Sequence, residues 1–352
     1  MATRLSPLVS IIIPMRNTPY ELFDACVRSA LRQTYDNLEI IIVDDGSEEC
    51  AAVKCDRLAQ LSSKIKVLHQ APSGVSCARN AGIYASQGKW LCFLDADDEL
   101  YPECIQSAVH HGELYSADIV FGRIADSFST RCEPAAEWGF SEGCRVFSKA
   151  SSLYAMAQHI MSSLDLKNCD IPHGVQIGPC AKLYNRESIG DIRFREDLFI
   201  SEDRFFTCEI LNRSERIACC DELWYKINHH SKSTTQQFDV KHWISGLCAT
   251  ASAEAGYLQN ANEVGCCMQA MMVIDALQEK NGTHARSLIR ELARNPLIGW
   301  QAKPDYSTFI LSRPRRLMIW LGEHNFLHAY YCMTVLRFCK KRIRKTINSV
   351  IG

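Results

Sequence analysis

The first 120 residues alternate short apolar runs with segments of helical periodicity. Residues 9–13 and 40–43 are rich in β-branched side chains and show little polar alternation, which is typical of strands buried on both faces of a parallel sheet. Between them, residues 22–31 place apolar side chains on one face of a helix. The same alternation predicts strands at 65–68, 90–94 and 118–121 and helices at about 48–61, 74–86 and 102–114. The pattern predicts a doubly wound α/β domain with a mostly parallel sheet.

The pattern changes in the second half of the 352 residues. We expect an irregular insertion at about 128–145, helices at 149–164 and 202–213, a further element at 181–186 and a strand at 223–227. Beyond about residue 234 the chain reads as mostly helical. We therefore predict an α/β domain over residues 1–233 and a helical C-terminal extension over residues 234–352.

Polar residues follow the ends of four predicted strands, at Arg16-Asn17, Asp44-Asp45, Ser73-Gly74 and residues 95–98. Because the carboxyl ends of parallel strands meet at one edge of a sheet, these residues should line a single crevice. A carboxylate at this edge could accept a hydrogen bond from a nucleobase N–H group, and another could hold ribose hydroxyls.

The last of these polar segments contains Asp95, Asp97 and Asp98 directly after a buried strand. Neighbouring carboxylates repel one another and are costly to desolvate, and a divalent cation relieves that cost. Carboxylate oxygens suit Mg²⁺ or Mn²⁺, and both ions hold diphosphates. The alternative is a polar loop in which Asp98 or Glu99 caps the helix near Pro102.

Two other polar groups also have structural alternatives. Arg79, with the N-terminal end of its helix, could face a phosphate group, or it could form a structural ion pair. Residues 44–47 could instead be a turn followed by a helix cap.

Composition and missing motifs exclude several classes of protein. The chain has no Gly-x-x-x-x-Gly-Lys-Ser/Thr loop and no Gly-x-Gly-x-x-Gly after its first strand, which argues against P-loop and dinucleotide-binding proteins. A net charge of −1 gives no argument for nucleic acid as a partner. The 18 cysteines include no Cys-x-x-Cys pair, so no spacing supports a zinc or thioredoxin-like site. We expect a reducing, cytoplasmic compartment.

Four motifs, in this order and at this spacing, resemble family 2 glycosyltransferases of the GT-A fold. The motifs are Pro14-Met15-Arg16-Asn17, Val43-Asp44-Asp45-Gly46-Ser47, Ala78-Arg79-Asn80-Ala81-Gly82 and Asp95-Ala96-Asp97-Asp98. The resemblance continues at residues 182–186 and 201–206 and covers roughly residues 7–230. Together the motifs are specific, although each alone is weak.

This resemblance implies an inverting, metal-dependent transferase that uses a nucleotide-diphosphate sugar, with a UDP-sugar as the expected donor. By match to the family pattern, Asp45 with Asp44 would hold the base, and Asp95 would contact the ribose. The residues implied in donor binding are Pro14, Arg16, Asn17, Asp44, Asp45, Arg79, Asp95 and Ala96. Asp97, assisted by Asp98, would bind Mn²⁺ or Mg²⁺.

The same resemblance assigns the catalytic groups to Glu202 and Asp203. Asp203 would be the general base that takes the proton of the acceptor hydroxyl, and Glu202 would orient the acceptor. The acceptor side would lie in residues 123–233. The alternative is ordinary acidic enrichment in a first helical turn. His229 or His230 stands where some relatives add a metal ligand, and a surface histidine pair is the favoured alternative.

Departures from the broader family narrow the expected function. No Gln-x-x-Arg-Trp stretch and no membrane-spanning segment is found, so we expect single-sugar addition to a glycan or lipid-linked acceptor in cell-surface polysaccharide assembly of the bacterial type. Basic residues between 313 and 345 flank an apolar, aromatic stretch, which suits peripheral binding to an anionic membrane surface. A solvated helix end or a partner subunit are the alternatives, and the oligomeric state stays open.

Two rival functions remain at this point. One is a nucleotidyltransferase on a similar frame, which a glycine-rich, basic signature near the first strand would favour; Pro14-Met15-Arg16-Asn17 does not provide one. The other is a non-catalytic nucleotide-sugar-binding scaffold. Loss of the metal-binding or base carboxylate would favour it, yet Asp97 and Asp203 are both present.

Overall fold

The computed structural model describes only part of the chain. The described residues are 6–126, 138, 140, 143–162, 166, 171–172, 175, 178–198, 200–228, 246–250, 252–253, 256–262 and 266. The chain divides into two compact units, the first formed by residues 1–161, 168–197 and 201–236 and the second by residues 162–167, 198–200 and 237–352. The expected boundary at residue 234 stays a prediction, because most of the chain beyond residue 228 lies outside the described residues.

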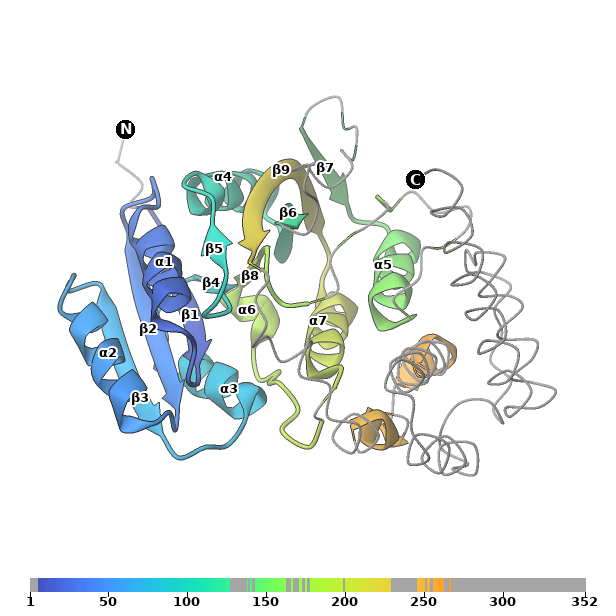
Figure 1. The fold of residues 1–352 in the computed structure, drawn as a ribbon. Helices are drawn as coiled ribbons and strands as arrows, with labels where there is room; N and C mark the ends of the chain where they lie inside the picture. Colours follow the sequence, from blue (N-terminus) through green and yellow to red (C-terminus); the bar gives the residue numbers. More distant parts are fainter. Residues whose placement is uncertain are drawn as a thin grey trace, which may run out of the picture. The chain divides into compact units, whose positions relative to one another are not determined.

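The first unit is built on a β-sheet with helices packed against it (Figure 1). The strands are β1 (Val9–Met15), β2 (Leu38–Asp45), β3 (Ile65–Gln70), β4 (Trp90–Phe93), β5 (Glu99–Leu100), β6 (Ile119–Asp126), β7 (Cys144–Phe147), β8 (Lys182–Asn185) and β9 (Ile217–Ile227). The helices are α1 (Tyr20–Leu31), α2 (Glu49–Ala59), α3 (Val75–Ala85), α4 (Cys104–Tyr115), α5 (Ala150–Ser162), α6 (Arg186–Ile189) and α7 (Glu202–Arg213). The strand order is β3-β2-β1-β4-β8-β6-β9-β5, and β7 pairs with β9.

The first four strands form the predicted parallel half of the sheet. β1 pairs in parallel with β2 and β4, and β2 pairs in parallel with β3. Every residue of β1 and β2 is buried, as apolar, β-branched runs require. Helix α3 crosses so close to β1 that a Cβ at Gly82 would lie 2.3 Å from Cγ2 of Ile12. The predicted doubly wound α/β fold is confirmed in this half.

The other half of the sheet is mixed. β8 lies between β4 and β6 and runs antiparallel to both, whereas β6 and β9 are parallel. Strand β9 begins at Ile217, earlier than the strand predicted from residue 223, and β6 extends past its predicted end to Asp126. β7 falls at the end of the segment that was predicted to be irregular, and β5 was not predicted.

An aromatic cluster fastens helix α7 to the centre of the sheet. The Phe93 ring of β4 lies edge-on to Tyr184 of β8, Phe194 and Phe206 of α7, with ring centroids 5.2 to 5.7 Å apart. The Phe194 and Phe206 rings stack at 3.9 Å. This packing fixes α7 against β4, the strand that leads into the aspartate segment.

The second unit is described at few positions, which include helical residues 246–250 and the 3₁₀ turn η1 (Gly256–Leu258). Within the described residues, no helix combines the length and apolar character needed to cross a membrane. His229, His230 and the basic segment at 313–345 lie outside the described residues.

Candidate active site

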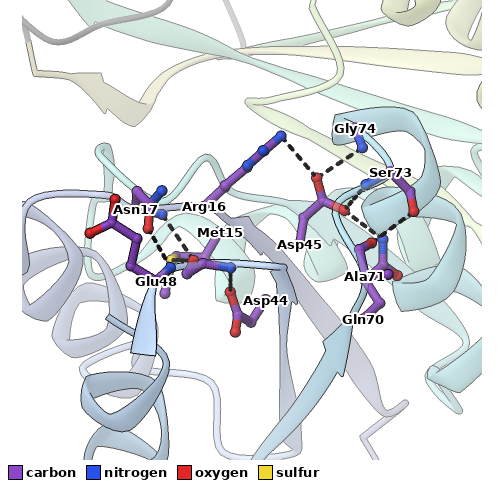
Figure 2. Close-up of polar contacts among 11 residues, drawn as sticks. Met15, Arg16, Asn17, Asp44, Asp45, Glu48, Gln70, Ala71, Ser73 and Gly74 are labelled. Atoms are coloured by element: carbon purple, nitrogen blue, oxygen red, sulfur yellow. Dashed lines mark hydrogen bonds and ion pairs between the residues drawn. The ribbon is translucent and has the colours of Figure 1, made fainter. Parts of the chain in front are cut away.

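The polar segments predicted to share one edge of the sheet do meet there. In the parallel register Met15 faces Asp44, Asp44 faces His69, and Asp45 faces Gln70. The β1–α1 loop is tied to the β2–α2 loop: the Asn17 N–H donates to Ser47 Oγ at 2.9 Å, and Asn17 Oδ1 accepts from the Glu48 N–H at 2.8 Å (Figure 2). The loops are therefore held together by their own hydrogen bonds.

Asp45 is buried at the centre of this loop cluster. Its Oδ1 accepts from the Ser73 N–H at 2.7 Å and from Gln70 Nε2 at 2.9 Å, and its Oδ2 accepts from the Gly74 N–H at 2.8 Å (Figure 2). The half-exposed Arg16 guanidinium lies 3.9 Å from Oδ2. A carboxylate has about four lone-pair sites, so roughly one site remains for a ligand donor.

The turn after β2 depends on a glycine. Gly46 has a φ of +68°, and a Cβ at this position would lie 2.4 Å from the Pro72 ring. A side chain would therefore push the β3–α3 turn away from Asp45. The segment is indeed a turn, as one of the sequence alternatives held. No side chain of the described residues caps α2, however.

Asp44 is held by a histidine that sequence reasoning did not single out. Its carboxylate accepts from the Ser47 N–H at 3.0 Å and lies 2.8 Å from His69 Nδ1. Burial acts to raise the pKa of Asp44, but the hydrogen bonds from Ser47 and His69 outweigh it, and the pKa lies below its usual value. Hydrogen bonds from Asp44 and Asp56 raise the pKa of His69. The buried Asp44 therefore anchors the loop to His69, whose side chain is 44% exposed.

Arg79 of α3 joins the segment after β4 to the first turn of α7. Its buried guanidinium lies 3.0 Å from Asp95 Oδ1 and 3.1 Å from Glu202 Oε1. Although burial opposes it, the charges of Asp95 and Glu202 raise the pKa of Arg79 further. The structural ion pair considered for Arg79 is thus observed, and it brings together residues separated by 123 positions along the chain.

The aspartates after β4 differ in their surroundings. Asp95 is 38% exposed at its side chain, Asp97 is half-buried, and Ala96 and Asp98 are buried. Asp98 Oδ2 accepts from the Tyr225 hydroxyl at 2.8 Å, and Oδ1 accepts from the Asn228 N–H at 2.8 Å. Helix α4 begins at Cys104 without a side-chain cap from the described residues. The alternative in which Asp98 or Glu99 caps this helix is therefore wrong.

Burial and a neighbouring charge leave Asp98 poorly ionised. Desolvation raises its pKa to about 7, Asp95 and Asp97 add to this rise, and the hydrogen bonds from Asn228 and Tyr225 oppose it. Such a group of oxygen donors fits a hard divalent cation, whose charge would relieve the repulsion. Among the described residues, however, the three aspartates do not bring three carboxylate oxygens within 4.8 Å of one another. Because Mg²⁺ is often bound by only one or two carboxylates together with substrate phosphates, this spacing is compatible with a cation held jointly by the protein and a diphosphate.

Glu202 and Asp203 open helix α7, as predicted. Burial raises the pKa of Glu202 to about 7, the neighbouring Asp203 adds to the rise, and Arg79 opposes it. Asp203 is half-buried, and its Oδ1 accepts from the Arg204 N–H at 2.8 Å. Pro14 is buried inside β1, where its ring stiffens the strand end.

Tyr225 and Asn228 could not be singled out from the sequence. They lie at the end of β9, about 130 positions after Asp98, and only the sheet topology brings them to it. The tyrosine hydroxyl also accepts from the Asp95 N–H at 3.2 Å. The sequence offers one indication of their role: Tyr225 carries a polar hydroxyl within a predicted strand.

Comparison with protein families gives a match to the model described as Glycosyl transferase family 2, over residues 10–191. The uncharacterized glycosyltransferase EpsJ of Bacillus subtilis is 30% identical over 235 residues, which are 65% of this chain and 63% of EpsJ. The putative glycosyltransferase EpsH of the same organism is 29% identical over 266 residues, 74% of this chain and 71% of EpsH. The chain thus spans less than two thirds of the length of EpsJ.

Solved structures share the fold at low sequence identity. Residues 1–349 of S. aureus TarS in complex with UDP-GlcNAc superpose with a TM-score of 0.65 and 14% identity, covering 93% of this chain and 90% of that one. The mannosyltransferase PcManGT from Pyrobaculum calidifontis, in complex with GDP-Man and Mn²⁺, gives a TM-score of 0.50 and 13% identity over 94% of this chain and 88% of that one. The GT-A fold is confirmed by these neighbours.

Proposed function

Because the chain belongs to glycosyl transferase family 2, we propose that it moves a single sugar from a nucleotide-diphosphate sugar to a hydroxyl of a glycan or lipid-linked acceptor, with inversion at the anomeric carbon. The acceptor would belong to a bacterial cell-surface polysaccharide pathway. The observation that carries the proposal is the ion-pair chain from Asp95 through Arg79 to Glu202. It joins the proposed donor side to the proposed acceptor side, and transfer requires both substrates to meet at one point.

On the donor side, we assign the base to Asp45 and the ribose to Asp95. Asp45 keeps roughly one lone-pair site beside its three N–H donors, which suits one N–H group of a base. Asp95 is partly exposed and keeps one oxygen beyond its contact with Arg79. The complexes of TarS with UDP-GlcNAc and with UDP support a UDP-sugar as the donor.

We assign metal binding to Asp97, with Asp98 assisting. The oxygen donors in this segment suit Mg²⁺ or Mn²⁺, and the Mn²⁺ complex of PcManGT supports such a cofactor. When bound, the cation would neutralise negative charge on the diphosphate leaving group. Asp98 is buried and Asp97 is half-buried, so we expect Asp97 to be more accessible to the cation and to contribute more to its binding.

On the acceptor side, the Asp203 carboxylate would accept the proton of the acceptor hydroxyl. The hydroxyl oxygen then bonds to the anomeric carbon as the bond from that carbon to the diphosphate oxygen breaks on the opposite face. Asp203 lies in the first turn of α7, where the helix dipole favours the negative form of a base. Glu202, held by Arg79, would orient the acceptor.

Thermal unfolding with a panel of nucleotide sugars tests this proposal directly. A ligand that binds the native state raises the melting temperature by mass action. We expect a shift for one nucleotide series in the presence of Mn²⁺, and its loss in EDTA. Folded protein that responds to no donor at concentrations far above those typical for this class of ligand would contradict the donor-site assignment.

A further inference from the structure

Three side chains with soft or borderline ligand atoms converge away from the proposed active site. They are His111 of α4, Cys144 of β7 and Cys220 of β9, and one ligand atom from each lies within 4.8 Å of the other two. This is the one such group found among the described residues. Strands β7 and β9 lie side by side (Figure 1). In this antiparallel pair Cys144 lies directly opposite Cys220, and their Sγ atoms are 3.2 Å apart.

The histidine of this cluster has one nitrogen without a partner. His111 Nδ1 is buried and accepts or donates no hydrogen bond within the described part of the chain. The other ring nitrogen, Nε2, lies 3.5 Å from Oε1 of Glu222. A carboxylate behind one imidazole nitrogen, with the other nitrogen directed to a metal, is the usual arrangement around zinc-bound histidines.

We propose that His111 Nδ1, Cys144 Sγ and Cys220 Sγ bind a zinc ion, with Glu222 positioning the imidazole. Two thiolates and one imidazole suit Zn²⁺ and not Mg²⁺ or Mn²⁺, so this site is chemically separate from the cation of the proposed reaction. The fourth tetrahedral position would hold water. On binding, each thiol gives up its proton to solvent, and the ion compensates the two negative charges in their buried setting.

Burial of the ligands matches a built site. Cys220 is fully buried, Cys144 is 7% exposed, and the His111 side chain is 15% exposed. An unpaired buried nitrogen next to two buried sulfurs is costly unless something binds them.

The proposed ion would fasten β7 and α4 to β9. Strand β9 ends at Ile227. Tyr225, near this end, donates a hydrogen bond to Asp98, so the proposed ion would stabilise the strand that positions Asp98. Because the family motifs do not include these ligands, and Cys144 and Cys220 are 76 positions apart, no local spacing reveals the site.

Cobalt substitution of the full-length chain tests the proposal. Protein purified without oxygen and stripped with a chelator is titrated with Co²⁺. We expect one equivalent to produce a thiolate-to-cobalt charge-transfer band and strong visible bands of tetrahedral cobalt. One equivalent of Zn²⁺ should remove them, and excess Mg²⁺ should not. Cys144→Ser and Cys220→Ser should lose the charge-transfer band, whereas the control Cys219→Ser should keep it, since its side chain points to the other face of β9.

A second measurement does not depend on whether the variants fold. Zn²⁺ should protect Cys144 and Cys220 of the native protein from alkylation, while the exposed Cys50 is modified at an unchanged rate. Absence of cobalt bands in the unsubstituted protein would overturn the proposal, as would equal alkylation with and without Zn²⁺. Two fewer thiols than the 18 of the sequence, counted in denatured anaerobic protein, would assign the pair to a disulfide instead.

Discussion

Asp98→Asn should stabilise the protein, and more strongly at higher pH. The carboxyl of Asp98 is buried against Asp95 and Asp97, and its pKa is raised from 3.8 to about 7. The amide has nearly the same shape and carries no charge. It can still accept from the Asn228 N–H and donate to the Tyr225 oxygen, the two partners of the carboxylate.

The direction in which the free energy of unfolding changes with pH follows from the number of protons bound in the native and unfolded states. Below a pH of about 3.8 the carboxyl is protonated in both the native and unfolded chains, and the pKa difference contributes nothing. As the pH rises toward 7, the unfolded chain loses the proton first, so the free energy of unfolding falls by about 1.4 kcal/mol per pH unit. Above the native pKa of about 7 the loss stays constant.

The expected magnitude follows from the two pKa values. Integration gives a loss of about 2 kcal/mol at pH 5 and about 4 kcal/mol at pH 8 for the carboxylic acid. The variant has no such loss. Its stability relative to the parent protein should therefore increase by about 2 to 3 kcal/mol between these pH values. Altered hydrogen bonding by the amide would change the stability by the same amount at both pH values, so it does not affect this difference.

Urea unfolding followed by tryptophan fluorescence measures the difference, because Trp90 and Trp224 are fully buried in the first unit. EDTA must be present, since a bound cation would favour the carboxylate. Asp36→Asn serves as the control because Asp36 is exposed, and it should show the same small effect at both pH values. An Asp98→Asn effect that does not change with pH would refute the reasoning and show that Asp98 is ionised in the native state.

Four further predictions concern the proposed reaction and its surroundings. Asp203→Asn should keep donor affinity in a thermal-shift titration while turnover falls by roughly 10²- to 10⁴-fold; turnover at the level of the unsubstituted protein would reject the base. Asp97→Ala should lose the Mn²⁺-dependent part of the donor-induced shift, and an unchanged shift would remove the metal assignment. Arg79→Met should lower the free energy of unfolding by about 3 to 5 kcal/mol at pH 8 and by less at pH 5, where Glu202 can take a proton; urea unfolding with no loss would show that the pair is not stabilising. Replacing the basic residues between 337 and 345 by glutamine should reduce sedimentation with anionic vesicles, and no change would exclude the peripheral membrane contact.

The parallel half of the sheet could be predicted because its signals are local. β1, β2 and β4 are runs of buried residues followed by turn residues, and the helices of this half show their own periodicity. The second half could not be predicted in the same way. β8 pairs with β4 across about 90 residues, and nothing in its four residues states which strand it joins or in which direction.

In the candidate site, too, the locally encoded features could be predicted and the long-range contacts could not. The residues of the four motifs were predicted to gather at one edge, and they do. The partners that set their charges come from elsewhere: His69 for Asp44, and Tyr225 and Asn228 for Asp98. The contacts of Asp98 depend on which strands pair across long stretches of sequence, and a local pattern does not state this. The roles of the motif residues in donor binding and catalysis stay predictions.

Burial divides four acidic residues of the motifs into two groups with different expected behaviour; Asp45 stands apart, because it is buried but keeps roughly one lone-pair site for a ligand donor. Asp44 and Asp98 are buried and satisfied by side chains and N–H groups of their own chain. Asp95 and Asp97 are partly exposed at the same edge. A buried, satisfied carboxylate gives up internal hydrogen bonds if it binds a ligand, whereas the solvent-exposed part of a half-buried carboxylate exchanges water for the ligand at lower cost. Substitution in the first group should therefore change stability more than donor affinity, and substitution in the second group should do the reverse. Asp97 and Asp98, neighbours in one acidic motif, thus fall on opposite sides of this division, since Asp98 is buried against Tyr225 and Asp97 is partly exposed.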